Sequence, residues 1–317
     1  MQPITRRRFV ALTATGVATA PLAMMARPVG GAVTAQEVFD RIKKNIGVAW
    51  KPETVDTFKA GDPSAVVTGI ATTSLVTLSV LDRAVKAGAN LIVTCEPTYY
   101  SRADSPTPPV MRGFRPGPAA QSSQPSNQAE TPPPDPVFSG KEDFIKKHNL
   151  VVFRLSDHWR LRAPDPFARG LSDALGWSKL TAAGDPKHVS IPEISLDTLV
   201  SHVKTGLKSR GGMRIVGNPQ QRIRKVAFLP GSTPIQASIE TLPEVDTIIA
   251  GEVREWETVE YVRDSVALGG KKSLILVGRV VSEDPGMHVC AQWLEAIVPE
   301  TTSMWISAGD PYWRPQA

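Results

Sequence analysis

The sequence predicts an α/β protein whose two halves, called lobes here, have similar patterns of strands and helices. From Ala65 onward, short β-branched segments alternate with segments of helical periodicity, which is typical of α/β layers. The 317 residues are 41% hydrophobic and 21% charged, which excludes collagen, a coiled coil and a wholly disordered chain. Cys95 and Cys290 are too few for a disulfide scaffold and lack zinc-ribbon spacing. A large apolar core must therefore hold the fold.

Residues 1–35 are predicted to be a signal peptide. Residues 5–9, TRRRF, fit the bacterial twin-arginine pattern, an apolar stretch follows, and Val33 and Ala35 offer a small-residue cleavage site. The alternative is an uncleaved membrane anchor, but Pro21 interrupts the apolar stretch, which falls short of the roughly 20 residues of a spanning helix. We therefore expect a periplasmic or secreted protein with no stable membrane span.

Most of the net positive charge of the chain lies in this predicted signal peptide. The whole chain has a formal net charge of +5, from 36 Lys and Arg against 31 Asp and Glu. Four of the arginines lie in residues 1–35, which hold no acidic residue, so 32 basic residues face 31 acidic ones in the remainder. No basic cluster interleaved with aromatic residues is present there, so we expect no nucleic-acid partner.

The first lobe contains a helix and a central strand with clear signals. Leu78, Leu81 and Ala84 share one helical face, and Gly88 suits the left-handed position after a helix. Residues 90–94 are apolar on both faces, which indicates a central strand. For this lobe, residues 36–165, the predicted elements are strand 66–71, helix 75–87, strand 90–94, helix 141–148 and strand 150–155.

A proline-rich insert, residues 101–138, interrupts the first lobe. It holds ten of the 28 prolines and no apolar periodicity, which predicts a long surface loop or a partly disordered segment. A second lobe is expected over residues 166–300, followed by a tail, 301–317. Its predicted elements are helices 166–175, 196–207, 235–242, 255–268 and 287–297, and strands 225–229, 247–250 and 274–277.

Polar side chains follow four of the predicted strands. Cys95 and Glu96 follow the first of them, residues 156–160 (SDHWR) the second, Glu252 the third, and residues 279–287 the fourth. In open α/β sheets, ligands collect beyond the carboxyl ends of strands. Carboxylates, a thiol and an imidazole at converging strand ends suit a metal site or an acid–base site.

These segments resemble the Nif-three-like dinuclear metal centre family, whose members include GTP cyclohydrolase I type 2 homologues, and in particular its exported branch. The resemblance runs from about Asn45 to the end of the last predicted helix, apart from the insert. It is clearest in residues 88–100, in residues 157–159, in residues 251–257 and in residues 282–287. It implies two similar lobes around a cleft, a ring-like hexamer, and a pair of divalent metals held by histidines and carboxylates.

This chain departs from the family's ligand pattern. Carried over by position, the resemblance places the ligands at Cys95, Glu96, Arg160, Arg279 and Glu283, where histidine is expected at several positions. His158 is the one histidine in a matching motif. Arginine stays protonated and is a poor metal ligand. The candidate metal ligands are Cys95, Glu96, Asp157, His158 and Glu283, and the candidate ligand-pocket residues are Arg160 and Arg279; Asp157 and Glu252 are also candidates for groups that orient ligands.

Two hypotheses follow from this departure. In the first, the guanidinium groups of Arg160 and Arg279 replace the metals, and the protein binds a small anionic ligand or serves as a non-catalytic homo-oligomer. In the second, one divalent metal (zinc, iron or manganese) survives and activates water for hydrolysis of a small heterocyclic or phosphorylated substrate. Catalytic residues are not assigned. An arginine within hydrogen-bond reach of Glu96 or Glu283 favours the first hypothesis.

Overall fold

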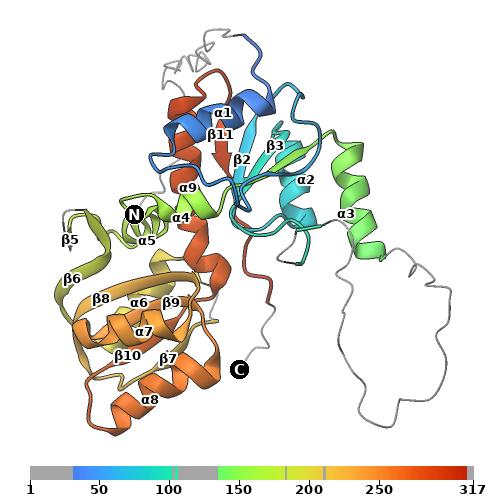
Figure 1. The fold of residues 1–317 in the computed structure, drawn as a ribbon. Coiled ribbons are helices and arrows are strands. Elements are labelled where there is room, and N and C mark those ends of the chain that lie inside the picture. The colour runs from blue at the N-terminus through green and yellow to red at the C-terminus, as the bar shows by residue number, and fades with distance from the viewer. Residues whose placement is uncertain (1–30, 102–103, 106–134, 183, 210–211, 313–317) are drawn as a thin grey trace, which may run out of the picture.

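The computed structural model describes residues 31–101, 104–105, 135–182, 184–209 and 212–312. The chain forms an α/β fold with two sheets, each covered by helices, as the sequence predicts. The two lobes lie one above the other, and the last helix, α9 (Arg279–Ile297), runs from one lobe into the other (Figure 1). Among the described residues, no helix has the length and apolar character needed to cross a membrane.

The first sheet has the strand order β1-β4-β3-β2-β11. Its central strands β2, β3 and β4 run parallel, β11 runs parallel to β2, and β1 is antiparallel to β4. The bounds are β1 Phe58–Ala60, β2 Ile70–Thr73, β3 Leu91–Thr94, β4 Val151–Arg154 and β11 Ser303–Trp305. Because the parallel strands end at one edge, the segments that follow them are brought together there.

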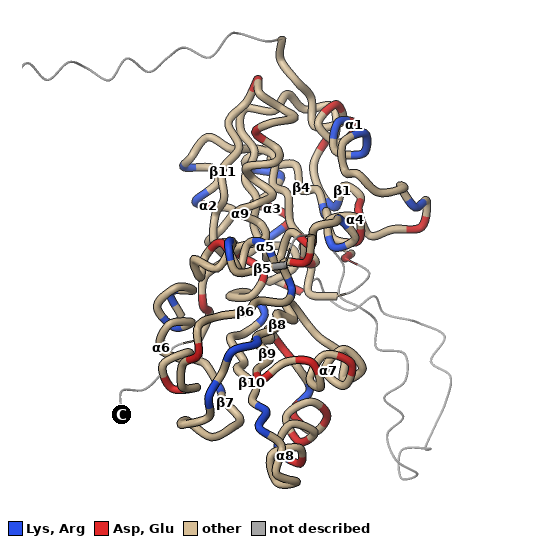
Figure 2. Tube along the Cα trace, turned by 90° about the vertical axis from the view of Figure 1, so that its left-hand side faces the viewer, with Lys and Arg blue, Asp and Glu red and all other residues tan. Residues whose placement is uncertain are grey.

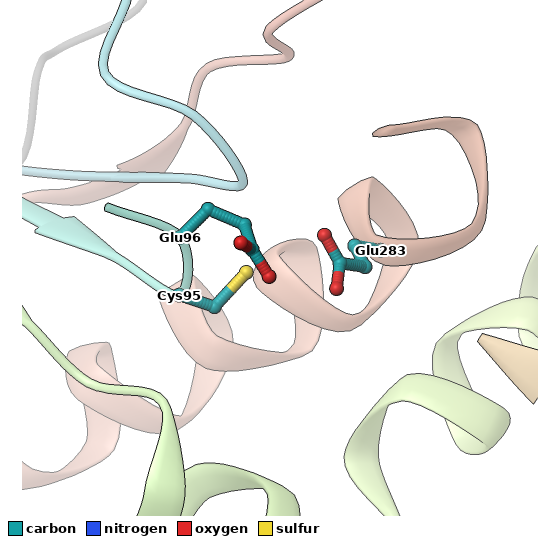
Figure 3. A group of neighbouring side chains, drawn as sticks. All are labelled: Cys95, Glu96 and Glu283. Carbon is teal, nitrogen blue, oxygen red and sulfur yellow. The ribbon is translucent and has the colours of Figure 1, made fainter. Parts of the chain in front are cut away.

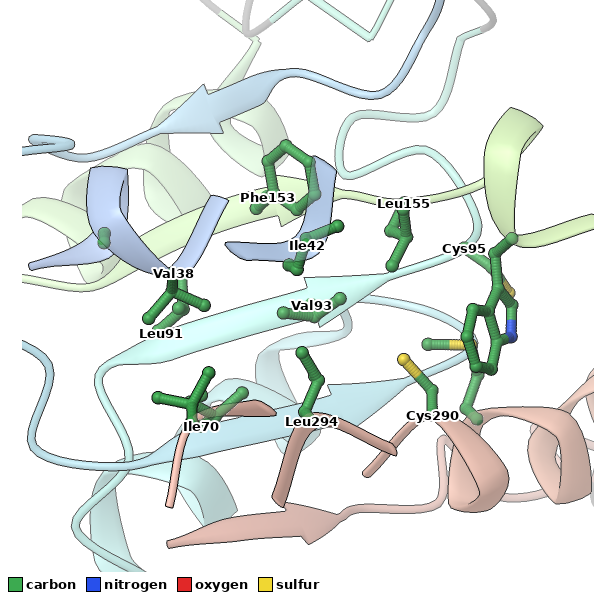
Figure 4. Packing of buried hydrophobic residues seen from close by; sticks show 14 of the residues in the cluster. Val38, Ile42, Ile70, Leu91, Val93, Cys95, Phe153, Leu155, Cys290 and Leu294 are labelled. Atoms are coloured by element: carbon green, nitrogen blue, oxygen red, sulfur yellow. The ribbon is translucent and has the colours of Figure 1, made fainter. Parts of the chain in front are cut away.

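Helices cover both faces of this first sheet. Helices α2 (Leu78–Lys86) and α3 (Pro136–Lys147) pack on one face, and α1 (Ala35–Asn45) with the second half of α9 on the other. On this second face, Cys290 and Leu294 of α9 lie against β2 and β3 (Figure 4). The first core is therefore built from both ends of the described chain.

The second sheet has the order β5-β6-β8-β9-β10-β7, with β8, β9 and β10 parallel. Helices α5 and α6 cover one face, and α7, α8 and the short helices η2 and η3 lie at the other. The strand bounds are β5 Thr181–Ala182, β6 Asp185–Ser195, β7 Arg214–Val216, β8 Arg222–Ser232, β9 Thr247–Glu252 and β10 Ser273–Leu276. The helix bounds are α5 Pro166–Ala174, α6 Leu196–Gly206, α7 Ile235–Thr241, η2 Leu242–Glu244, η3 Glu255–Val259 and α8 Glu260–Ala267.

Helix α9 begins eight residues before the predicted start at Met287. The sequence predicts a loop at Pro285 and Gly286, because proline cannot donate a backbone hydrogen bond within a helix. In the structure they lie inside the helix, where α5 crosses it: a Cβ on Gly286 would come within 2.4 Å of Phe167, and one on Gly170 within 2.4 Å of Pro285. Close helix packing, which no local pattern shows, therefore keeps this segment helical.

The chain ends also differ from the predicted boundaries. Residues 301–317 were expected to be a tail, and 166–300 the second lobe, yet β11 joins the first sheet and α9 packs on it. At the other end, Thr34 caps α1 through a capping box with Glu37, and Val33 is buried. Cleavage after Ala35 would remove this cap, so the fold starts before the predicted boundary.

Most of the proline-rich insert, 101–138, lies outside the described residues. Its last residues form the start of α3, which begins at Pro136 instead of the predicted Lys141. The Asp135 carboxylate accepts hydrogen bonds from the backbone of Val137 and Phe138, and proline is well tolerated in the first turn of a helix. Helix α1 and strands β1, β5, β6, β7 and β11 were not predicted either.

Candidate functional site

Charged residues of both signs occur in both lobes (Figure 2). The candidate site lies at the carboxyl edge of the first sheet, where the second lobe approaches it. Cys95 and Glu96 follow β3, and the Glu96 N–H donates to the carbonyl oxygen of Ser74, which follows β2, at 3.1 Å. The Thr94 hydroxyl donates to the same oxygen at 3.0 Å. These bonds fix the segment that carries both candidate ligands.

Arg160 comes from α4 (Asp157–Leu161), a single short helix after β4. Its N-terminus is capped by a residue distant in sequence: the buried Asp56 carboxylate accepts from the backbone N–H groups of Ser156, Asp157 and His158 at 2.6–2.9 Å. A carboxylate is the favoured partner of these free N–H groups. Asp56 therefore positions Arg160, and the sequence carries no local signal of this contact across about a hundred residues.

Arg279 and Glu283 lie one turn apart at the start of α9. The Arg160 Nη2 group donates to Glu96 Oε1 at 2.9 Å and also to Glu283 Oε1. The Arg279 Nη2 group donates to Glu96 Oε2 at 2.6 Å. Both oxygens of Glu96 are thus paired with arginine. We call these four residues the arginine–glutamate cluster.

Burial sets the electrostatics of this cluster. Glu96 and Glu283 are 4% and 0% exposed, whereas about a third of each arginine side chain is exposed. Burial raises the pKa of Glu283 to about 7, although the Arg160 charge opposes the shift. Burial, with the nearby Glu283 charge, also raises the pKa of the Cys95 thiol well above its ordinary value. The thiol is therefore protonated at neutral pH, and only a thiolate is a good metal ligand.

The second lobe closes over the cluster. The Gly231 N–H, near the end of β8, donates to the Ser282 hydroxyl on α9 at 2.9 Å. A Cβ at Gly231 would lie 2.6 Å from Glu283 Oε1 and 3.1 Å from Arg160 Nη1, and its φ of +77° is in the left-handed region that favours glycine. Glu252 stands at the rim, 3.9 Å from Arg279. The cluster thus lies where the lobes meet.

Three potential ligand atoms converge among the described residues. The Sγ atom of Cys95 and one carboxylate oxygen each from Glu96 and Glu283 lie within 4.8 Å of one another. Figure 3 shows the sulfur and the two carboxylates facing one another, from the segment after β3 and from α9. This set offers no histidine, and both carboxylates are already paired with arginine. The residues present do not fit a pair of metal ions.

His158 and Asp157 do not join this group. The His158 ring stacks on Trp50 at 3.9 Å, Nε2 accepts from the Lys51 N–H, and Nδ1 donates to Asp56. Both ring nitrogens are therefore used, and neither is available to a metal. The Asp157 carboxylate accepts from the Val55 N–H at 3.1 Å and from the Thr54 hydroxyl at 2.9 Å. Both residues hold the segment before β1 in place.

Fold and site together define a two-lobed α/β protein with a buried arginine–glutamate cluster at the lobe junction. Residues 163–309, slightly less than half of the chain, match the family model described as Duf34/NIF3 (NGG1p interacting factor 3). No curated protein matches the chain closely enough in sequence to count as a relative. The chain is therefore similar to the Duf34/NIF3 family over residues 163–309.

Several solved structures share the fold over most of the chain. The hypothetical protein SA1388 of Staphylococcus aureus aligns with a TM-score of 0.60 at 13% identity, covering 90% of this chain and 100% of its own. A Bacillus cereus protein related to NIF3 gives 0.60 at 12%, covering 90% and 100%. Protein ybgI, of unknown function, gives 0.61 at 17%, covering 88% and 100%. At such identities the likeness concerns the fold alone.

Proposed function

We propose that this protein is a non-catalytic member of the Duf34/NIF3 family, in which the Arg160 and Arg279 guanidinium groups take the electrostatic place of metal ions. The observation that carries the proposal is the pairing of both Glu96 oxygens, one with each arginine. Two buried carboxylates without counter-charges would destabilise the fold, and charge-assisted bonds to arginine offset part of that cost. The cluster then joins the segment after β3, α4 and α9.

The ligand class that suits this arrangement is a small anion. The cluster uses only Nη2 of Arg160. Guanidinium is a planar donor that recognises carboxylate and phosphate groups. An anion would meet the remaining nitrogens without disturbing the two glutamates.

A metal-dependent hydrolase is the second candidate, and the convergence of Cys95, Glu96 and Glu283 favours it. A metal ion there would have to displace both arginines from Glu96 and to draw a proton from the Cys95 thiol. Both steps cost free energy, so we rank this candidate second.

Metal analysis separates the two candidates. Protein purified without chelators should contain well below one equivalent of zinc, iron or manganese. Elemental mass spectrometry measures this content. One equivalent or more would contradict the arginine replacement. The double variant Arg160→His with Arg279→His should gain bound metal because it frees Glu96 and adds two imidazoles. The matched control is Arg263→His, whose arginine pairs with Glu260 on an exposed helix face; equal uptake in the control would overturn the assignment of these positions.

Export by the twin-arginine route and assembly into a homo-oligomer, possibly a hexamer as the family resemblance implies, are further proposals that rest on the sequence. Export is tested by fractionation of cells that carry the full chain, compared with cells that carry the double variant Arg6→Lys with Arg7→Lys. Light scattering of the purified protein tests assembly, and a monomer would contradict it.

A further inference from the structure

A cavity of about 240 Å³ lies beside the arginine–glutamate cluster, on the side of the second lobe. Its wall includes Arg160 from α4, Lys187 from β6, Phe167 from α5, and Phe228 and Ser232 from β8. Such a volume is somewhat below the roughly 300–1,000 Å³ of pockets for drug-sized ligands, and it suits one smaller organic molecule. The cavity is therefore the size of a small metabolite and is built from both lobes.

Arg160 presents a fixed guanidinium group to this cavity. Nη2 is held by Glu96 and Glu283, and the Cζ atom lies 4.7 Å from the centre of the Phe167 ring. Neither Nε nor Nη1 donates a hydrogen bond to any residue in the described part of the chain. A guanidinium that is already held in place loses little entropy when it binds a ligand.

Lys187, from β6, supplies a second positive charge to the lining of the cavity. Its ammonium lies 3.5 Å from Asp165 Oδ2, and the side chain is half-exposed. Asp165 also caps α5, because its Oδ1 accepts from the Phe167 and Ala168 backbone at 2.9 and 3.2 Å. This carboxylate is thus shared between a helix N-terminus and Lys187, and the ammonium keeps donors for a ligand.

The remaining wall is largely apolar. Leu229 and Pro230 are partly exposed and Pro234 is exposed, and these three side chains supply its accessible apolar surface, whereas Phe167 and Phe228 are almost fully buried behind the wall. An inorganic anion such as phosphate would leave Leu229, Pro230 and Pro234 against water, whereas an apolar body would cover them. The wall therefore favours a ligand that combines one acidic group with a hydrocarbon part.

We propose that this cavity binds a small organic carboxylate, with the acid group between Arg160 and Lys187 and the apolar body against Leu229, Pro230 and Pro234. The inference rests on the proposed function, because it needs Arg160 as part of a metal-free cluster. It goes further by naming the chemical class of the ligand and the residues that select it.

Ligand-observed NMR titration of the purified full chain tests this proposal, with benzoate as the probe. Benzamide, an uncharged molecule of the same shape, should bind at least about tenfold more weakly, because a charge-assisted hydrogen bond contributes roughly 1.5–3 kcal/mol. The variant Lys187→Met should weaken benzoate binding about tenfold and leave benzamide unchanged. The matched control is Lys225→Met, a lysine of the same sheet that lines a different cavity, and it should bind benzoate as the unmodified chain does.

Three results would overturn the proposal: no benzoate binding up to about 10 mM, equal binding of benzamide, or an equal loss in Lys225→Met. Tighter binding of inorganic phosphate than of benzoate would show an anion site without the apolar selectivity, and would also overturn it. Metal content measured on the same sample keeps the two proposals apart. If the protein is metal-free and does not bind benzoate, only the proposal of a carboxylate site in the cavity is overturned. If the protein contains bound metal, the proposed function is overturned.

Discussion

Arg160 is the residue on which the site depends. Its Nη2 group contacts carboxylates from two distant segments, Glu96 after β3 and Glu283 on α9. A single positive charge between two buried negative charges provides the kind of stabilisation that a metal ion would provide, without the capacity of a metal to activate water. A change at this one position therefore removes the positive charge that Glu96 and Glu283 share.

Substitution Arg160→Met should lower the free energy of unfolding by about 3 kcal/mol, because it leaves Glu283 buried without its main counter-charge. Urea denaturation followed by circular dichroism measures the change. The double variant Arg160→Met with Glu283→Met should regain most of the loss, since both charges are then absent. Arg263→Met breaks an exposed pair with Glu260 and should cost less than about 1 kcal/mol. An equal cost for Arg160→Met and Arg263→Met would contradict the role of the cluster.

At the scale of elements, buried charges hold helices against loops far away in sequence. The Lys141 ammonium on α3 is 2% exposed and donates to the carbonyl oxygens of Val76 and Thr98, each at 2.7 Å. It also lies 4.4 Å from the centre of the Tyr100 ring. This lysine ties α3 to the loops after β2 and β3, just as Asp56 ties the start of α4 to the segment before β1.

Lys141 should make stability depend on pH in the alkaline range. Burial lowers its pKa from 10.5 to about 8, so between these two values the folded chain binds fewer protons than the unfolded chain. The cost of burying the charge is complete below about pH 8 and is relieved as the pH rises toward 10.5. The free energy of unfolding of the unmodified chain, relative to Lys141→Met, should therefore rise over this window, by about 3 kcal/mol at most.

Urea denaturation at several pH values from 8 to 10.5 measures this difference. Lys147→Met, at an exposed lysine of the same helix, controls for the loss of one positive charge. A difference between the unmodified chain and Lys141→Met that stays flat or falls with pH would show that the buried amine does not titrate in this range.

At the scale of the whole molecule, the two lobes share one long helix. The first half of α9 carries Arg279 and Glu283 at the junction, and its second half places Cys290 and Leu294 in the core of the first sheet (Figure 4). The chain then adds β11 to that sheet in parallel register with β2. Because the ends of the described chain meet in one core, the lobes should unfold together.

Substitution Leu294→Ala should cost about 2–5 kcal/mol, because Leu294 is fully buried. It should shift the unfolding of both lobes equally, since α9 joins them. Tryptophan fluorescence and far-ultraviolet circular dichroism in urea report on the transition. Leu268→Ala, at a leucine that is 89% exposed, should change stability by less than about 0.5 kcal/mol. Two separate transitions in Leu294→Ala, with only one shifted, would contradict a single cooperative unit.

The sequence by itself determined the α/β class, the central strands β3 and β4, most helices of the second lobe, and the polar strand ends that supply Glu96, Arg160 and Glu283. Hydrophobic periodicity and the residues at helix ends are local signals, and the grouping of ligands beyond the carboxyl ends of strands follows from sheet topology. A single sequence is therefore enough to recognise them. Only the tertiary structure decided that α9 continues through Pro285, that β11 completes the first sheet, and that His158 holds a loop while two arginines hold Glu96. These outcomes depend on contacts between residues 64 or more positions apart, where packing and burial of charge outweigh local propensity.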